Sequence, residues 1–207
     1  MIRSLLSFAL IVITGCQPSI APSPASEASR VESSSGGHLP TVQGASLPIQ
    51  IFERHCFRPD AQYDTITALA EAMNLDPLPA NLEPFMASQE GKGKGYVVEV
   101  ERDGSEFKRI LLLGASELNT CSVYAQGYQA DEILEEAKLN YQLLSIMRDD
   151  VGLQVNEMFI PGGVSSRISE AHSKGVIGVM VAKPGSGAGD AITLSFTSPG
   201  TARKIFH

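Results

Sequence analysis

Three side chains of the types that form a hydrolytic triad lie close together in one polar stretch: Ser166, Glu170 and His172. A triad needs a nucleophile, a histidine base and a carboxylate that orients the base. The surrounding segment has the composition of a polar connection, in which such side chains are normally solvated. We therefore predict no catalytic residues. If the domain is nevertheless a hydrolase, Ser166 and His172 are the pair that it would use.

Two glycine-rich segments resemble chemical motifs only in composition. Gly91-Lys92-Gly93-Lys94-Gly95 lacks the spacing and the Lys-Ser/Thr ending of a phosphate-binding loop, and it precedes an expected strand instead of a helix. Gly185-Ser186-Gly187-Ala188-Gly189 lies between two expected strands, whereas a nucleophile elbow joins a strand to a helix. Both segments are predicted to be loops or turns, so we predict no cofactor and no cofactor-binding residues.

Residues 1–16 have the three-part layout of a secretory signal. Arg3 precedes a short apolar stretch, which ends at the small residues Thr14 and Gly15. As a helix this stretch would be about 15 Å long, roughly half of a bilayer core. We therefore expect export from the cytoplasm, and the segment is too short to be a stable transmembrane span.

Ile13-Thr14-Gly15-Cys16 resembles the lipobox of bacterial lipoproteins. The resemblance implies that residues 1–15 are a signal peptide and that the Cys16 thiol carries a diacylglyceryl group, with a further acyl chain on its new amino group. Two or three acyl chains anchor a protein stably. Gln17 stands where an aspartate would favour the inner membrane, so the resemblance implies the periplasmic face of the outer membrane.

Residues 16–47 form the expected linker, which is rich in proline, serine and glycine. Its few large apolar residues cannot bury enough surface to offset the entropy of ordering the chain, so we expect disorder. A flexible coil of about 31 residues has a mean reach of about 30 Å. That reach suits a tether between a membrane and a folded domain.

Two cysteines remain after Cys16, namely Cys56 and Cys121. Both fall on expected inward faces, and in an oxidising compartment a disulfide between them is the leading interpretation. The alternative is two separate buried thiols. A redox role would need a C-x-x-C motif, and a zinc site would need a second ligand pair at the right spacing. We therefore predict no metal ligands.

A single folded domain is expected over residues 48–207. It begins with a short helix that carries Ile49, Phe52 and Cys56 on one face. A second helix is expected to begin with Asp64 as its N-cap and to end near Asn74.

The rest of this domain is predicted to consist of strands around one long helix. Periodicity indicates three strands, then the helix, then three strands, over about 96–101, 107–113, 120–125, 131–147, 153–160, 176–183 and 191–197. This order predicts an α+β fold with a mainly antiparallel sheet of about six strands. The long helix stands between two three-strand halves.

The formal net charge of −7 excludes an electrostatic footprint for nucleic acid, which requires clustered Lys and Arg. The chain has no tryptophan, and aromatic residues are only 6%, so stacking platforms for sugars or bases are scarce. The paired carboxylates Glu135-Glu136 and Asp149-Asp150 are predicted to be solvated.

Three short motifs of the domain resemble an uncharacterised family of small Gram-negative envelope proteins and lipoproteins. They are Phe52-x-x-x-Cys56, Leu75-x-x-Leu78-Pro79 and Cys121-Ser122-Val123-Tyr124-Ala125. The resemblance covers the first half of the domain and implies the Cys56–Cys121 pairing. It departs from the family at Tyr96, where a tryptophan is frequent, and it implies no activity.

Together these observations favour a lipid-anchored envelope protein with a non-enzymatic binding domain over an enzyme. The expected partners are the membrane, through the lipid on Cys16, and an envelope protein or cell-wall component. A first alternative is an inhibitor of an envelope hydrolase, in which Ile160-Pro161-Gly162-Gly163-Val164-Ser165 would enter the cleft of its target. A second alternative is a periplasmic hydrolase.

Overall fold

The computed structural model describes residues 45–60, 62–79, 92–104 and 106–206. The predicted signal peptide, the predicted lipidation site at Cys16 and nearly all of the predicted linker lie outside these residues. Helix α1 begins at Leu47, close to the expected start of the domain.

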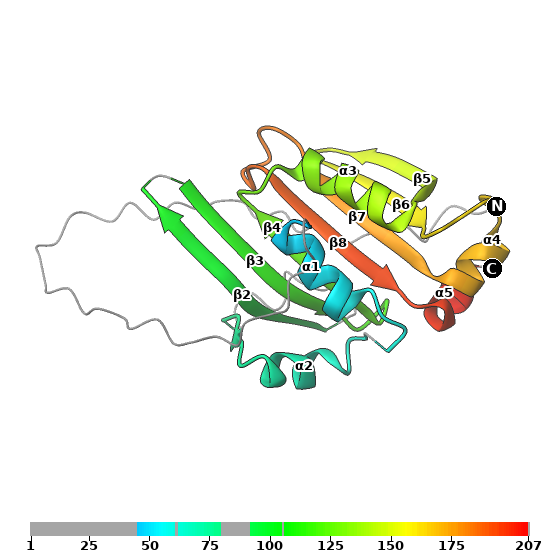
Figure 1. Ribbon diagram of the computed structural model, residues 1–207, viewed down its shortest axis with the longest axis horizontal. Coiled ribbons are helices and arrows are strands. Elements are labelled where there is room, and N and C mark those ends of the chain that lie inside the picture. The colour runs from blue at the N-terminus through cyan, green and yellow to red at the C-terminus, as the bar shows by residue number, and fades with distance from the viewer. Residues whose placement is uncertain (1–44, 61, 80–91, 105, 207) are drawn as a thin grey trace, which may run out of the picture.

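One open antiparallel sheet of eight strands forms the centre of the structure (Figure 1). The strands lie in the order β1-β2-β3-β4-β8-β7-β6-β5. Their bounds are Asp76–Pro77 for β1, Gly93–Asp103 for β2, Glu106–Ala115 for β3, Thr120–Gln126 for β4, Leu144–Val151 for β5, Gln154–Ile160 for β6, Val176–Ala182 for β7 and Ala191–Thr197 for β8. The α+β class and the antiparallel sheet are confirmed, whereas the prediction of about six strands was wrong.

The additional full-length strand is β5, which occupies part of the expected long helix. That helix, α3, spans Ala130–Tyr141 and ends because Gln142 adopts a left-handed conformation with φ of 48°. The chain then turns into β5 at one edge of the sheet. Helix α3 is therefore followed by four strands, β5 to β8, and the prediction of three strands after this helix was wrong.

The two halves of the sheet have the same local topology. Each is an antiparallel meander in chain order, β1 to β4 and β5 to β8, and each is preceded by helical structure. The meanders join where β4 pairs with β8, from Cys121 opposite Phe196 to Gln126 opposite Ala191. The centre of the sheet is thus formed by the last strand of each half.

The main core lies between one face of the sheet and a layer of helices, as the front of Figure 1 shows for α1 and α3. Helix α1, Leu47–Ile51, continues into the π-helical turn η1, Phe52–Cys56. The predicted inward face is confirmed, because Ile49, Phe52 and Cys56 are each 0% exposed. Phe57 joins the layers, with its ring 4.7 Å from that of Tyr141 on α3 and 5.0 Å from that of Phe196 on β8.

Helix α2 spans Ile66–Ala72 and follows Thr65, so the prediction of Asp64 as its N-cap was wrong. Helices α4, Ile168–Lys174, and α5, Pro199–Ile205, were not predicted. They pack on the other face of the sheet at one end, against Met158, Ile160 and Val176. Successive strand residues point to opposite faces, which is why Phe159 belongs to the main core and its two neighbours to this second cluster.

Candidate functional site

The structure joins Cys56 of η1 to Cys121 of β4 by a disulfide, with the two Cα atoms 5.1 Å apart. This agrees with the leading interpretation of the two cysteines. Both residues lie in the main core, 0% and 1% exposed. The bridge fastens the N-terminal helical layer to the central strands of the sheet.

The polar side chains of the segment that follows β6 are engaged separately. Oε2 of Glu170 accepts backbone hydrogen bonds from Val164 at 3.0 Å and Ser165 at 3.3 Å. Nε2 of His172 lies 2.6 Å from the carbonyl oxygen of Phe206. Ser166 is exposed on the loop. The described contacts hold a loop and dock α5, and they do not bring Ser166, Glu170 and His172 together as a triad.

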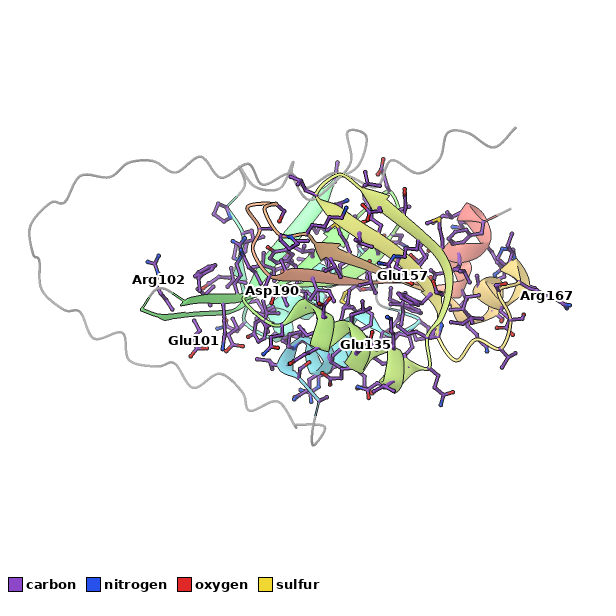
Figure 2. All side chains as sticks on the ribbon, turned by 90° about the horizontal axis from the view of Figure 1, so that it is seen from above. Glu101, Arg102, Glu135, Glu157, Arg167 and Asp190 are labelled. Atoms are coloured by element: carbon purple, nitrogen blue, oxygen red, sulfur yellow. A yellow bond between two sulfur atoms is a disulfide. The ribbon has the colours of Figure 1, made fainter. Side chains whose placement is uncertain are left out.

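The β6–α4 loop, residues 161–167, is instead held by Glu170 and Lys174 of α4 and by Tyr141 at the end of α3, and we call it the braced loop. Besides the two bonds from Glu170, Gly162 donates its N–H to the Tyr141 carbonyl at 2.8 Å and accepts a hydrogen bond from Nζ of Lys174. Desolvation raises the pKa of Glu170, but the two backbone hydrogen bonds and Lys174 outweigh it and leave the pKa below its ordinary value. The brace presents Val164 to solvent at 87% exposure, and Figure 2 shows the neighbouring Arg167 projecting past the end of the sheet.

A cleft of about 90 Å³ lies between α3 and the β5–β7 part of the sheet, and we call it the α3 cleft. Its floor is two rows of side chains that the strand register places on one face. Arg148, Glu157 and Val179 are opposite one another in the first row. Val155 and Val181 form the second row, and Asp131 and Leu134 of α3 form the wall.

Two carboxylates outside the cleft hold α3 in place above the sheet. Oδ1 of Asp190, from the β7–β8 loop, accepts the N–H of Ala130 at 3.0 Å and so satisfies one of the free donors at the start of the helix. Oε1 of Glu136 accepts the N–H of Ser46 at 2.9 Å. The wall of the cleft is therefore fixed to the β7–β8 loop and to the segment that precedes α1. Figure 2 labels Asp190 together with Glu135 of α3 and Glu157 of the floor.

The chemical centre of the α3 cleft is the carboxylate of Glu157, whose residue is only 9% exposed. Its Oε1 accepts a hydrogen bond from Oγ of Ser145 at 2.8 Å. Its Oε2 lies 3.7 Å from Nη1 of Arg148, which is too long for a hydrogen bond, and the Arg148 side chain is 65% exposed. The cleft thus presents a largely buried anion with unused acceptor capacity between valine and leucine side chains.

Glu157 was not predicted as a site residue, although the sequence carries a signal for it. Val155, Glu157 and Phe159 share one face of β6, and Phe159 is 1% exposed in the main core. A carboxylate in the apolar phase of a strand is costly to bury without partners. Such an interruption of the pattern marks a position to test for function.

A second buried polar group lies beside the disulfide. His55 is 8% exposed, and its Nε2 has no hydrogen-bond partner within the described structure. Burial, together with the charges of Arg54 and Arg58, lowers the pKa of His55 to about 4. His55 is therefore neutral at neutral pH.

No family model matches the chain, and neither does a curated protein or a solved structure. The resemblances to lipoproteins and to an envelope family therefore stay predictions. Over the ranges that the structure covers, no helix is long and apolar enough to cross a bilayer, and no three or more His, Cys, Asp or Glu side chains gather as a metal site.

Proposed function

We propose that this protein is anchored by lipid on Cys16 to the periplasmic face of the outer membrane and that its domain binds another envelope component without catalysis. The observation that carries the binding function is the α3 cleft, in which Leu134 and three valines lie around the buried Glu157 carboxylate, with Arg148 and Asp131 completing the lining. A concave site that combines apolar side chains with a few placed polar groups is the usual form of a binding pocket.

The proposed compartment is supported by the cysteines. A buried disulfide between Cys56 and Cys121 suits an oxidising compartment, because cytosolic reductants keep thiols reduced. The predicted lipobox would place the domain in that compartment, and the predicted tether would let it reach a partner at some distance from the lipid surface.

Site-specific photo-crosslinking in living cells tests the binding function. A photoreactive amino acid replaces Leu134, which lines the α3 cleft. The matched control replaces Leu139 of the same helix, which is 77% exposed and lies about 140° further round the helix. We expect a discrete adduct with an envelope component from position 134 and none from position 139. Equal adducts at both positions, or none at 134, would refute the proposal.

The braced loop favours a second candidate function, inhibition of an envelope hydrolase. A protein loop that enters an enzyme cleft gains affinity when its bound conformation is already fixed. Glu170 and Lys174 fix the backbone around Val164, and Ile168 adds a second exposed apolar side chain at 50%. The test adds the purified protein to cell-wall lytic enzymes, with Val164→Asp as the control. Inhibition that the variant lacks supports this candidate, and unchanged rates at micromolar excess oppose it.

A further inference from the structure

We infer that the α3 cleft takes a lysine side chain of a partner protein, with its ammonium group on Glu157. This inference rests on the proposed binding function and names the chemistry that the partner must present.

The size of the α3 cleft limits its occupant to one side chain. Its volume of about 90 Å³ is well below the range of about 300–1,000 Å³ that small-molecule pockets occupy. It is large enough for several water molecules, each of which needs about 10–15 Å³. An unbranched aliphatic chain with a small polar end fits such a volume.

The lining matches the two parts of a lysine side chain. Val155, Val179 and Val181 offer apolar contact to four methylene groups, and Leu134 covers them from the helix. Glu157 supplies the anion, with Oε2 not hydrogen-bonded to its nearest cation at 3.7 Å. An ammonium group is a compact donor of three hydrogen bonds, so it can bond to this oxygen without displacing Ser145 from the other oxygen.

Arg148, the cationic side chain in the floor of the cleft, does not block this site. The Arg148 side chain is 65% exposed and its Nη1 is 3.7 Å from Oε2 of Glu157, so a ligand ammonium would replace it as the cation beside this oxygen while the guanidinium moves into solvent. The opposite wall carries Asp131, and the exposed Glu132 follows it on α3, so this side of the cleft has an acidic rim, whereas Asp150 of β5 is already paired with Lys183. This acidic rim would attract a cationic partner and repel an acidic one.

Ligand-observed NMR with short peptides tests the assignment. The lipidated full chain, purified in detergent, is mixed with a capped tripeptide that has lysine at its centre. A second tripeptide carries norleucine, which has the same stem without the charge. We expect saturation transfer to the stem protons of lysine and much weaker transfer to norleucine. Detergent alone provides the background. Absence of transfer to lysine, or equal transfer to norleucine, would overturn the inference.

Two variants locate the binding. Glu157→Gln keeps the shape of the side chain and should lower the affinity for the lysine peptide about tenfold or more, because a charge-assisted hydrogen bond is lost. Glu135→Gln is the matched control, since Glu135 lies on α3 with a side chain 66% exposed, and it should leave the affinity unchanged. If Glu157→Gln does not fold, Leu134→Trp replaces it by filling the cleft from its wall. Undiminished affinity in the folded variant would overturn the assignment.

The outcomes separate this inference from the proposed function. If the photo-adduct at position 134 forms but the lysine peptide does not bind, the domain has a partner and the ligand class is wrong. If the peptide binds at Glu157 but no adduct forms, the cleft accepts lysine and the proposed partner function fails.

Discussion

Removal of the Cys56–Cys121 bridge should lower the stability of the domain by a large and calculable amount. The perturbation is the double substitution Cys56→Ala and Cys121→Ala, made together so that no single thiol remains. The bridge closes a separation of 65 residues. In the chain-entropy account, a loop of that length constrains the unfolded state by about 4 kcal/mol at 25 °C. Both cysteines are buried in the core, so the loss of their two sulfur atoms lowers the stability of the folded state in the same direction.

Guanidinium unfolding, followed by far-ultraviolet circular dichroism because the chain has no tryptophan, measures this loss. Both parent and variant carry Cys16→Ser, so that lipid does not interfere. We expect the free energy of unfolding to fall by about 4 kcal/mol and the denaturant slope to rise, because the uncrosslinked unfolded chain exposes more surface. At about 2–4 °C per kcal/mol for a domain of this size, the midpoint of thermal unfolding should fall by about 8–16 °C.

Chemical reduction of the parent provides an independent removal of the same bond. The reduced parent should unfold with a free energy close to that of the double variant. A difference of less than about 1 kcal/mol between the oxidised parent and both other forms would refute the reasoning. It would mean that the loop is already constrained in the unfolded state.

Three further predictions follow from single polar groups. The pKa of His55 is lowered to about 4 in the folded protein, so between pH 6.5 and 4 the His55 side chain is protonated in the unfolded chain but not in the folded one. Stability should therefore fall as the pH drops through that window, and His55→Gln should flatten the fall in unfolding titrations at pH 7 and 4.5; parallel curves would contradict this. Glu170→Ala should speed the hydrogen exchange of the Val164 and Ser165 amides while leaving the core amides protected. In the parent protein, the hydrogen bonds from these amides to Glu170 should persist above the ordinary carboxyl pKa. They should be lost as the pH falls through the lowered pKa of Glu170. Asp190→Ala should lower the free energy of unfolding by about 1 kcal/mol, as the loss of a helix cap does. Asp190→Asn should lower it much less, because the amide oxygen of asparagine can still accept the hydrogen bond from Ala130. An equal loss of stability in both variants would point to the charge of Asp190 instead of this hydrogen bond.

The parts of the fold that could be predicted are those with a strong hydrophobic period. Ile192, Leu194 and Phe196 alternate with polar residues, and all three are buried on one face of β8. The same holds for the helical spacing of Ile49, Phe52 and Cys56. Where one face of a helix or strand is fully buried, every residue on that face is apolar, so the spacing of apolar residues in the sequence predicts the type of element.

The parts that could not be predicted lie at the margins of the sheet. Strand β5 is an edge strand with exposed charges from Arg148 to Asp150, so it has no continuous apolar face. Its first residues continue the apolar spacing of α3, and the break depends on the left-handed conformation of Gln142. Helices α4 and α5 are seven residues each and bury little more than Ala171 and Ala202, too short a stripe to be recognised.

The α3 cleft could not be predicted because it depends on a register. Arg148, Glu157 and Val179 come from three strands, and they meet only because these strands pair with those residues opposite one another. The sequence could have marked Glu157 as a misplaced charge. It could not have shown that Asp131 and Leu134 of α3 would lie above it.

Intact mass analysis of the mature protein, extracted from the membranes of its native cell, tests the central claim most directly. The account predicts that the N-terminal residue is Cys16, that its sulfur carries diacylglycerol, and that the mass contains a bridge between Cys56 and Cys121. A soluble cytosolic product that retains residues 1–15 and has an unmodified thiol at position 16 would contradict it.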